Sequence, residues 1–171
     1  MTTMRAGIGL LGLVTLLAAG CGGGGSEARA VLQGAAGTPV KGTATFTQEG
    51  DGVHVVVEVE NVSPGSHGIH VHEKGDCSAP DFSSAGEHFA PEPDPHGDPT
   101  QGPHHAGDLG NLEVGEGGTG KVDATFEGLT VEDGPRSVVG RALVVHADPD
   151  DLKTQPSGNS GGRIACGVIG R

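Results

Sequence analysis

The sequence contains no tryptophan and no tyrosine, and only four phenylalanines among its 171 residues. Aromatic side chains are the largest contributors of buried apolar area, so the core of this protein has to be built without them, and bound metals or a crosslink would add stability. The sequence also shows no internal repeat, no heptad pattern and no amphipathic helix of useful length. These absences argue against repeat proteins, coiled coils and helical bundles.

Basic residues are also scarce: 10 Lys and Arg stand against 22 Asp and Glu, for a formal net charge of −12. Binding to a nucleic-acid backbone depends on clustered positive charge, so we expect no nucleic-acid partner. An anionic substrate would need a local concentration of positive charge on this acidic protein.

No apolar run is long enough for a comfortable transmembrane span. The longest, residues 6–20, follows the single charge of Arg5 and ends in small residues before Cys21. A basic start followed by a short apolar stretch is typical of a secretory signal peptide, which we predict over residues 1–20. Without it the net charge becomes −13, because only Arg5 is removed.

The end of this run, Leu17-Ala-Ala-Gly-Cys21, resembles a bacterial lipobox, in which the cysteine is lipidated. The match is imperfect, because Ala18 stands where leucine is usual. We predict lipid attachment at Cys21, with ordinary cleavage of a secretory signal nearby as the alternative. Residues 21–27 read as a Gly-rich flexible tether, and residues 28–171 as one domain.

Three cysteines are present, and setting Cys21 aside leaves the pair Cys77 and Cys166. In the oxidising compartment that export implies, we expect these two to form a disulfide. Such a bond closes a loop of about 90 residues, which a chain-entropy model values at about 4 to 5 kcal/mol. The alternative is two buried free thiols.

The sequence is rich in turn residues, with 33 Gly and 11 Pro, which favours many short strands. Two long intervals, 74–107 and 147–162, show no strand or helix period, and intervals of this length in a compact domain are usually functional. We predict an all-β sandwich or flattened barrel with two long functional loops at one end. The eight predicted strands are 28–35, 40–47, 53–60, 67–73, 108–113, 120–126, 140–146 and 163–169.

The stretch Gly68-Ile-His-Val-His-Glu73 places His70 and His72 two residues apart in a predicted strand. Residues i and i+2 of a strand share one face, so both imidazoles can converge on one ion. An isolated His-x-His fits a solvated surface strand equally well. With His146 at the end of another strand, however, three imidazoles become available, and nitrogen ligation of this kind favours Cu(II).

The first long interval and the residue after it contain a second set of metal-binding residue types. Three imidazoles and one aspartate make an acceptable closed zinc shell. A merely solvated loop would leave so many histidines unexplained, whereas a bound ion would give the interval a reason to be ordered. The candidates are His88, His96, His104, His105 and Asp108.

Five motifs in order identify a resemblance over about residues 28–171. Together they resemble the Cu/Zn superoxide dismutases, and specifically the exported bacterial branch. This family is a standard case of the Greek-key sandwich, so the resemblance implies an eight-stranded Greek-key β-sandwich or flattened barrel. The motifs are Gly68-Ile-His-Val-His72, Ser84-Ala-Gly-Glu-His-Phe89, His105-Ala-Gly-Asp-Leu-Gly-Asn111, Gly140-Arg-Ala-Leu-Val-Val-His146 and Gly162-Arg-Ile-Ala-Cys-Gly-Val-Ile-Gly170.

The resemblance implies one copper and one zinc ion per chain, with His88 bridging the two. The family motif places a zinc ligand three residues before the aspartate, which selects His105 over His104. The copper ligands would be His70, His72, His88 and His146, and the zinc ligands His88, His96, His105 and Asp108.

Three further roles follow from the resemblance. Asp150 would hydrogen-bond both a copper ligand, His70, and a zinc ligand, His96, and so orient their rings. Arg163 would lie beside the copper and guide the anionic substrate. The Cys77–Cys166 disulfide would hold Arg163 in place.

The function implied is dismutation of superoxide to dioxygen and hydrogen peroxide, by a copper that is alternately reduced and oxidised next to a structural zinc. We expect an exported bacterial enzyme that defends against superoxide and touches the membrane only through a lipid at Cys21. Whether it is a monomer or a homodimer stays open.

Two other functions are weaker alternatives. A copper-buffering domain on the same fold would not need the bridging histidine, the zinc ligands or Arg163, and a zinc hydrolase would need an open zinc position and a general base. His54 and His67 are predicted to be structural, and Lys74 and Lys153 are candidates for attracting substrate.

Overall fold

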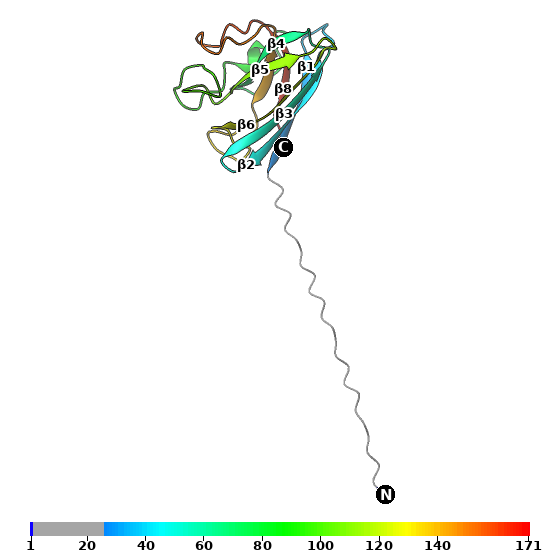
Figure 1. The fold of residues 1–171 in the computed structure, drawn as a ribbon, viewed down its shortest axis with the longest axis vertical. Coiled ribbons are helices and arrows are strands. Elements are labelled where there is room, and N and C mark those ends of the chain that lie inside the picture. The colour runs from blue at the N-terminus through cyan, green and yellow to red at the C-terminus, as the bar shows by residue number, and fades with distance from the viewer. Residues whose placement is uncertain (2–25) are drawn as a thin grey trace.

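A computed structural model describes Met1 and residues 26–171, so the predicted signal peptide and Cys21 lie outside the described residues. Within the described part, no helix is long and apolar enough to cross a membrane. Eight strands close into one barrel, and every paired neighbour is antiparallel (Figure 1). The strands are β1 Glu27–Gly34, β2 Lys41–Glu49, β3 Gly52–Glu60, β4 Gly65–His72, β5 Asp108–Val114, β6 Thr119–Glu127, β7 Ala142–His146 and β8 Arg163–Val168.

The order around the barrel is β1-β2-β3-β6-β5-β4-β7-β8. Strand β3 therefore pairs with β6, and β4 pairs with β7, so the chain crosses over twice as it does in Greek-key folds. The all-β prediction is confirmed, and each predicted strand matches an observed one to within two residues at either end. The only helix among the described residues is the single 3-10 turn Ser83–Ala85.

The barrel interior is filled mainly by aliphatic side chains, with Phe46 the largest that is fully buried. Buried and exposed residues alternate along β1, as the two-residue period of a strand requires. Strand β7 differs, because all five of its residues are buried. Leu143 and Val145 belong to the barrel core, while Ala142 and Val144 pack outside it against Phe82. A strand covered on both faces reads as a continuous apolar run.

The two long loops predicted at 74–107 and 147–162 are observed as the connections 73–107 and 147–162. They lie near β4 and β5 and are drawn in green and in orange to red in Figure 1. The first is tied to β4 by backbone hydrogen bonds: Phe89 N–H donates to the Val71 carbonyl, and Val71 N–H donates to the Gly107 carbonyl, each at 2.8 Å. A Cβ atom at Gly107 would collide with the Val71 carbonyl oxygen, so only glycine allows this approach. The outer face of β4 is thereby covered.

The structure contains a third long connection that the sequence prediction did not include, residues 128–141 between β6 and β7. Its Leu129, Val131 and Val138 are at most 2 % exposed and belong to the main core. These apolar side chains lie in an irregular segment, so they carry no two-residue period by which a pattern search would recognise them.

Candidate metal centre

The paired histidines of β4 lie on the outer face of the barrel. Along this strand Ile69 and Val71 belong to the barrel core, so the alternating His70 and His72 face the opposite side. Because the loops cover that side, both histidines are at most 1 % exposed. The interpretation of this motif as a solvated surface strand is therefore wrong.

Two more histidines reach these rings from distant parts of the chain. The loop 73–107 forms an isolated antiparallel bridge with β4, pairing His88 with His72. His146 ends β7 at a register shift where it pairs with Arg163, and such bulges re-aim the side chains that they carry. The Nε2 atoms of His72 and His146 lie 3.3 Å apart.

These four histidines form a compact set, here called the all-imidazole group: His70, His72, His88 and His146. Each offers one nitrogen, and the four nitrogens lie within 4.8 Å of one another. His70 Nδ1 and His88 Nε2 are buried without any hydrogen-bond partner. Buried polar atoms normally have partners, so these unpaired nitrogens fit a bound cation.

The remaining nitrogens of the group are held by the protein. His72 Nδ1 lies 2.9 Å from the Gly86 carbonyl oxygen, and His146 Nδ1 lies 3.3 Å from that of Gly161. Burial lowers the pKa of His70 to about 4, that of His72 to about 2 and that of His146 to about 3. These three rings are neutral at pH 7, which is the form that binds metals.

A second set, here called the mixed group, comprises His88, His96, His105 and Asp108, whose donor atoms also lie within 4.8 Å of one another. Asp108 Oδ1 lies 2.8 Å from His88 Nδ1, 3.0 Å from His96 Nδ1 and 3.5 Å from His105 Nδ1. Nitrogen and oxygen ligands of a tetrahedral zinc, at about 2.0–2.1 Å from the ion, stand about 3.3 Å apart. The spacing in this group suits that geometry.

Charge distinguishes the mixed group. Burial disfavours the Asp108 carboxylate, but its hydrogen bonds with His105, His88 and His96 outweigh burial and hold its pKa well below the usual range. Burial likewise opposes a charge on His96, yet hydrogen bonds with Asp108 and Asp150 raise its pKa to about 9. A buried carboxylate therefore lies among imidazoles, one of which takes a proton readily.

Asp150 connects the two groups. Its Oδ2 lies 2.7 Å from His70 Nε2, and its Oδ1 lies 2.9 Å from His96 Nε2. It is 4 % exposed, and although burial opposes its charge, the hydrogen bonds with His70 and His96 lower its pKa below the usual range. One carboxylate thus fixes a ring orientation in each group and directs Nδ1 of His70 and of His96 toward the other donor atoms of their groups.

Arg163 lies at the edge of the all-imidazole group. Its Nη1 donates to the Phe82 carbonyl and its Nη2 to the Gly86 carbonyl, both at 2.6 Å. Its charge contributes to the lowered pKa values of His72 and His146. The loop that presents these carbonyls is anchored to β8 by the predicted disulfide, which the structure contains, between Cys77 and Cys166.

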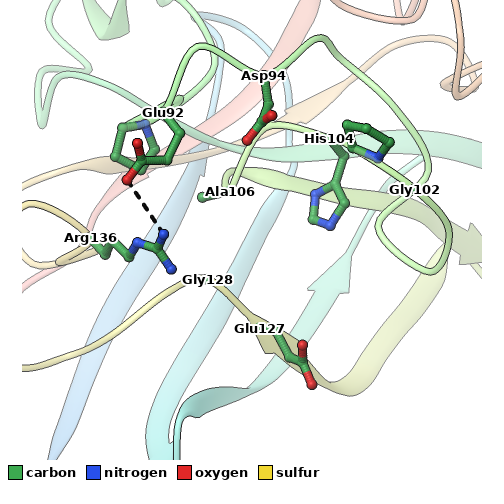
Figure 2. Close-up of a pocket in the computed structure, with 10 residues that line it drawn as sticks. Glu92, Asp94, Gly102, His104, Ala106, Glu127, Gly128 and Arg136 are labelled. Atoms are coloured by element: carbon green, nitrogen blue, oxygen red, sulfur yellow. Dashed lines mark hydrogen bonds and ion pairs between the residues drawn. The ribbon is translucent and has the colours of Figure 1, made fainter.

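The remaining histidines lie outside both groups. His104 lines a separate hollow of about 230 Å³ (Figure 2). Asp94, Glu127 and an ion pair between Arg136 and Glu92 line the same hollow. The mixed group contains His105 and not His104.

His67 and His54 have their own partners. The ring nitrogens of His67 contact the carbonyl oxygens of His146 and Ser63, at 2.8 and 2.9 Å. His54 pairs with Asp123 on the barrel surface at 2.8 Å. Of the two candidate lysines, Lys153 is exposed, and Lys74 forms an ion pair with Glu73 at 3.4 Å.

Two contributors were missed by the sequence analysis although both lie inside quoted motifs. The Gly86 carbonyl accepts hydrogen bonds from both Arg163 and His72. Gly86 has φ 75°, and a Cβ atom there would collide with Glu73. Asn111 donates to the Asp150 carbonyl at 2.9 Å and accepts from the Asp150 N–H at 2.8 Å. An unexplained glycine or asparagine within a ligand motif was the available signal.

Comparison with known proteins agrees with this geometry. The family model described as "Copper/zinc superoxide dismutase (SODC)" matches residues 40–169. A similar solved structure is titled "Crystal Structure Analysis of the clock protein EA4". It is 40% identical in sequence, the match covers 85% of this chain and 94% of that chain, and the TM-score is 0.78.

Proposed function

The chain belongs to the copper/zinc superoxide dismutase family, and from this we propose that its all-imidazole group holds copper and its mixed group holds zinc. As a member of the family the protein is an oxidoreductase that dismutates superoxide with these two metals. Donor chemistry supports the assignment of sites: imidazole nitrogens alone suit copper, and three imidazoles with a carboxylate make a closed zinc shell.

The observation that carries this proposal is the position of His88 between the groups. Its Nδ1 lies 2.8 Å from Asp108 Oδ1 in the mixed group, whereas its buried Nε2 has no hydrogen-bond partner and belongs to the all-imidazole group. One ring would thus offer a nitrogen to each ion. A ring that binds two cations has lost both of its protons, and two flanking dications favour that state.

When bound, copper would supply the one-electron chemistry by which one superoxide is oxidised to dioxygen and a second is reduced, with two protons, to hydrogen peroxide. The protein's part is to position groups and to move protons. Nε2 of His88 is the atom that can hold a proton for the product, while Nδ1 stays fixed against the mixed group. Asp150 keeps the rings of His70 and His96 oriented throughout.

Arg163 is proposed to guide superoxide. Hydrogen bonds with the two carbonyls fix its guanidinium close to His72 and His146. Charge steering of this kind, for which superoxide dismutases are a standard case, lets one local charge outweigh an acidic surface. Arg163→Gln should lower turnover about tenfold and weaken its dependence on salt, with metal content unchanged. Arg163→Lys serves as the control that keeps the charge, and equal kinetics in Arg163→Gln and the wild type would refute the role.

We also propose that the enzyme works outside the cytoplasm. The Cys77–Cys166 disulfide supports this location, because disulfides persist mainly in oxidising compartments. The signal-like residues 1–20 and the predicted lipid site at Cys21 support an anchored, exported protein. The mass of the N-terminal peptide from the expressing cell tests the idea: a lipid-modified Cys21 is expected, and an intact N-terminus would contradict it.

Superoxide dismutation, measured together with the copper and zinc content of the same sample, tests the two-site proposal. We expect fast dismutation with about one copper and one zinc per chain, and loss of activity when chelators remove the metals. Both metals bound without dismutation would contradict the enzymatic assignment and favour a copper-handling role.

A further inference from the structure

The backbone of His96 is isolated from all regular secondary structure. The residue lies in the loop 73–107 and is only 3 % exposed, so its N–H and carbonyl oxygen both need hydrogen-bond partners. Neighbouring backbone does not supply them. Pro95, which precedes it, has no N–H, and Gly97 N–H donates instead to Asp108 Oδ2 at 3.1 Å.

Both partners come from one side chain, that of Gln155 in the connection 147–162. Its Oε1 accepts from the His96 N–H at 2.9 Å, and its Nε2 donates to the His96 carbonyl at 2.8 Å. The carboxamide carries one acceptor and two donors and therefore mimics a peptide unit of a neighbouring strand. The second hydrogen on Nε2 is directed to the Lys153 carbonyl at 3.2 Å.

The segment that carries Gln155 is itself held by hydrogen bonds to its backbone. Asp151 Oδ1 accepts from the N–H groups of Lys153 and Thr154, and Gly158 N–H donates to the Thr154 carbonyl at 2.7 Å. The same connection carries Asp150, whose backbone is held to β5 through Asn111. The backbone that carries Gln155 is therefore held in place by local hydrogen bonds, and its connection is attached to the barrel through Asn111.

We infer that Gln155 is a positioning residue of the zinc site, which holds the peptide of His96 while Asp150 holds its ring. This inference rests on the proposed role of His96 as a zinc ligand. If Asp150 alone held the ring, the backbone of His96 could shift, and if Gln155 alone held the backbone, the ring could rotate. Asp150 and Gln155 belong to the same connection, 147–162, and together they fix both the backbone and the ring. The connection 147–162 thereby keeps His96 Nδ1 directed at Asp108.

Gln155→Met tests this role, because methionine keeps the length of the side chain and removes its hydrogen bonds. Gln101→Met is the matched control: Gln101 lies in the same loop as His96, is exposed, and donates only to Asp98 among the described residues. Zinc release from the copper- and zinc-loaded protein is followed with a chromogenic chelator. We expect Gln155→Met to release zinc about tenfold faster than the wild type, and Gln101→Met to match the wild type.

A spectrum separates positioning from general stability. With cobalt(II) in place of zinc, the visible absorption bands report ligand geometry, and we expect them to change in Gln155→Met only, while both metal-free variants unfold at similar temperatures. If the wild type and Gln155→Met both hold zinc and show equal release rates and equal cobalt spectra, the positioning role of Gln155 is overturned and the zinc assignment is not. A wild-type protein that holds no zinc would overturn the zinc assignment as well.

Discussion

The all-imidazole group and the mixed group share His88, yet they differ in the charge that they carry before an ion arrives. In the all-imidazole group, burial lowers the pKa values of His70, His72 and His146 to about 4, 2 and 3, so those rings are neutral. In the mixed group, the ring of His96 lies between two carboxylates, and its pKa is raised to about 9. A proton on this ring supplies positive charge next to the two carboxylates.

This difference shows how one fold prepares two kinds of site within a few ångströms. The rings of His70, His72 and His146 are neutral, so a cation can bind them without displacing a proton. The buried carboxylate of Asp108 is stabilised by a positive charge beside it, from protonated His96 or from a bound ion, because an uncompensated buried charge is costly. The shared ring couples the two, since a change at His88 alters both donor sets.

Removal of the shared ring should have the largest effect. His88→Ala takes one ligand from each group, and we expect dismutation to fall more than about 100-fold, with zinc lost more completely than copper. Activity and metal content of the purified variant are measured together. His104→Ala, sixteen residues further along in the same loop but outside both groups, should behave as the wild type. Comparable losses in the two variants would mean that His88 has no special position.

Loss of Asp150 should affect the two groups unequally. In Asp150→Ala we expect zinc affinity to fall about 10- to 100-fold and copper affinity to fall less. The reason is that His72 and His146 keep their own contacts with the Gly86 and Gly161 carbonyls. Competition with chelators of known affinity measures both. Asp148→Ala, which removes an exposed acid from the same segment, is the control, and equal losses for both metals would contradict the difference.

The last difference between the two groups concerns the protons that each metal displaces when it binds. Zinc has to displace the proton of His96, so its apparent affinity should rise about tenfold per pH unit between pH 6.5 and 9 and then level off. In the metal-free protein, the charge on His96 stabilises the fold fully below about pH 6.5, and this contribution disappears as the pH rises through about 9.

Copper binding should release no proton from His70, His72 or His146 at pH 7, because their pKa values lie far below. Calorimetry in two buffers of different ionisation enthalpy measures the proton count for each metal added alone to the metal-free protein, so that bridging of two ions by His88 does not enter the count. We expect about one more proton released by zinc than by copper. Equal proton release by the two metals would show that the groups do not differ in charge.

Much of the fold was predictable because strand periodicity and turn residues are local signals. The eight strands followed from alternation between Gly- and Pro-rich turns, and His70 with His72 followed from the two-residue period. The connection 128–141 did not, since Leu129, Val131 and Val138 are buried in an irregular segment. Residue identity alone gave the donor types, but position within a motif was needed to choose His105 over His104.

The contacts behind the ligands were not predictable in the same way. Gln155 and His96 are 59 residues apart, and Asn111 and Asp150 are 39 apart, so nothing in the local pattern joins them. The Gly86 carbonyl holds His72 and Arg163 through a backbone atom, which residue identity does not reveal. Only the closed barrel with its folded-back loops brings these groups together.

Anomalous scattering from crystals of the metal-loaded protein, recorded on either side of the copper and zinc absorption edges, tests the two-site assignment most directly. We expect the copper signal among His70, His72 and His146 and the zinc signal among His96, His105 and Asp108, with His88 between them. Copper in the mixed group, or a single ion that leaves His88 without a second metal, would contradict the assignment.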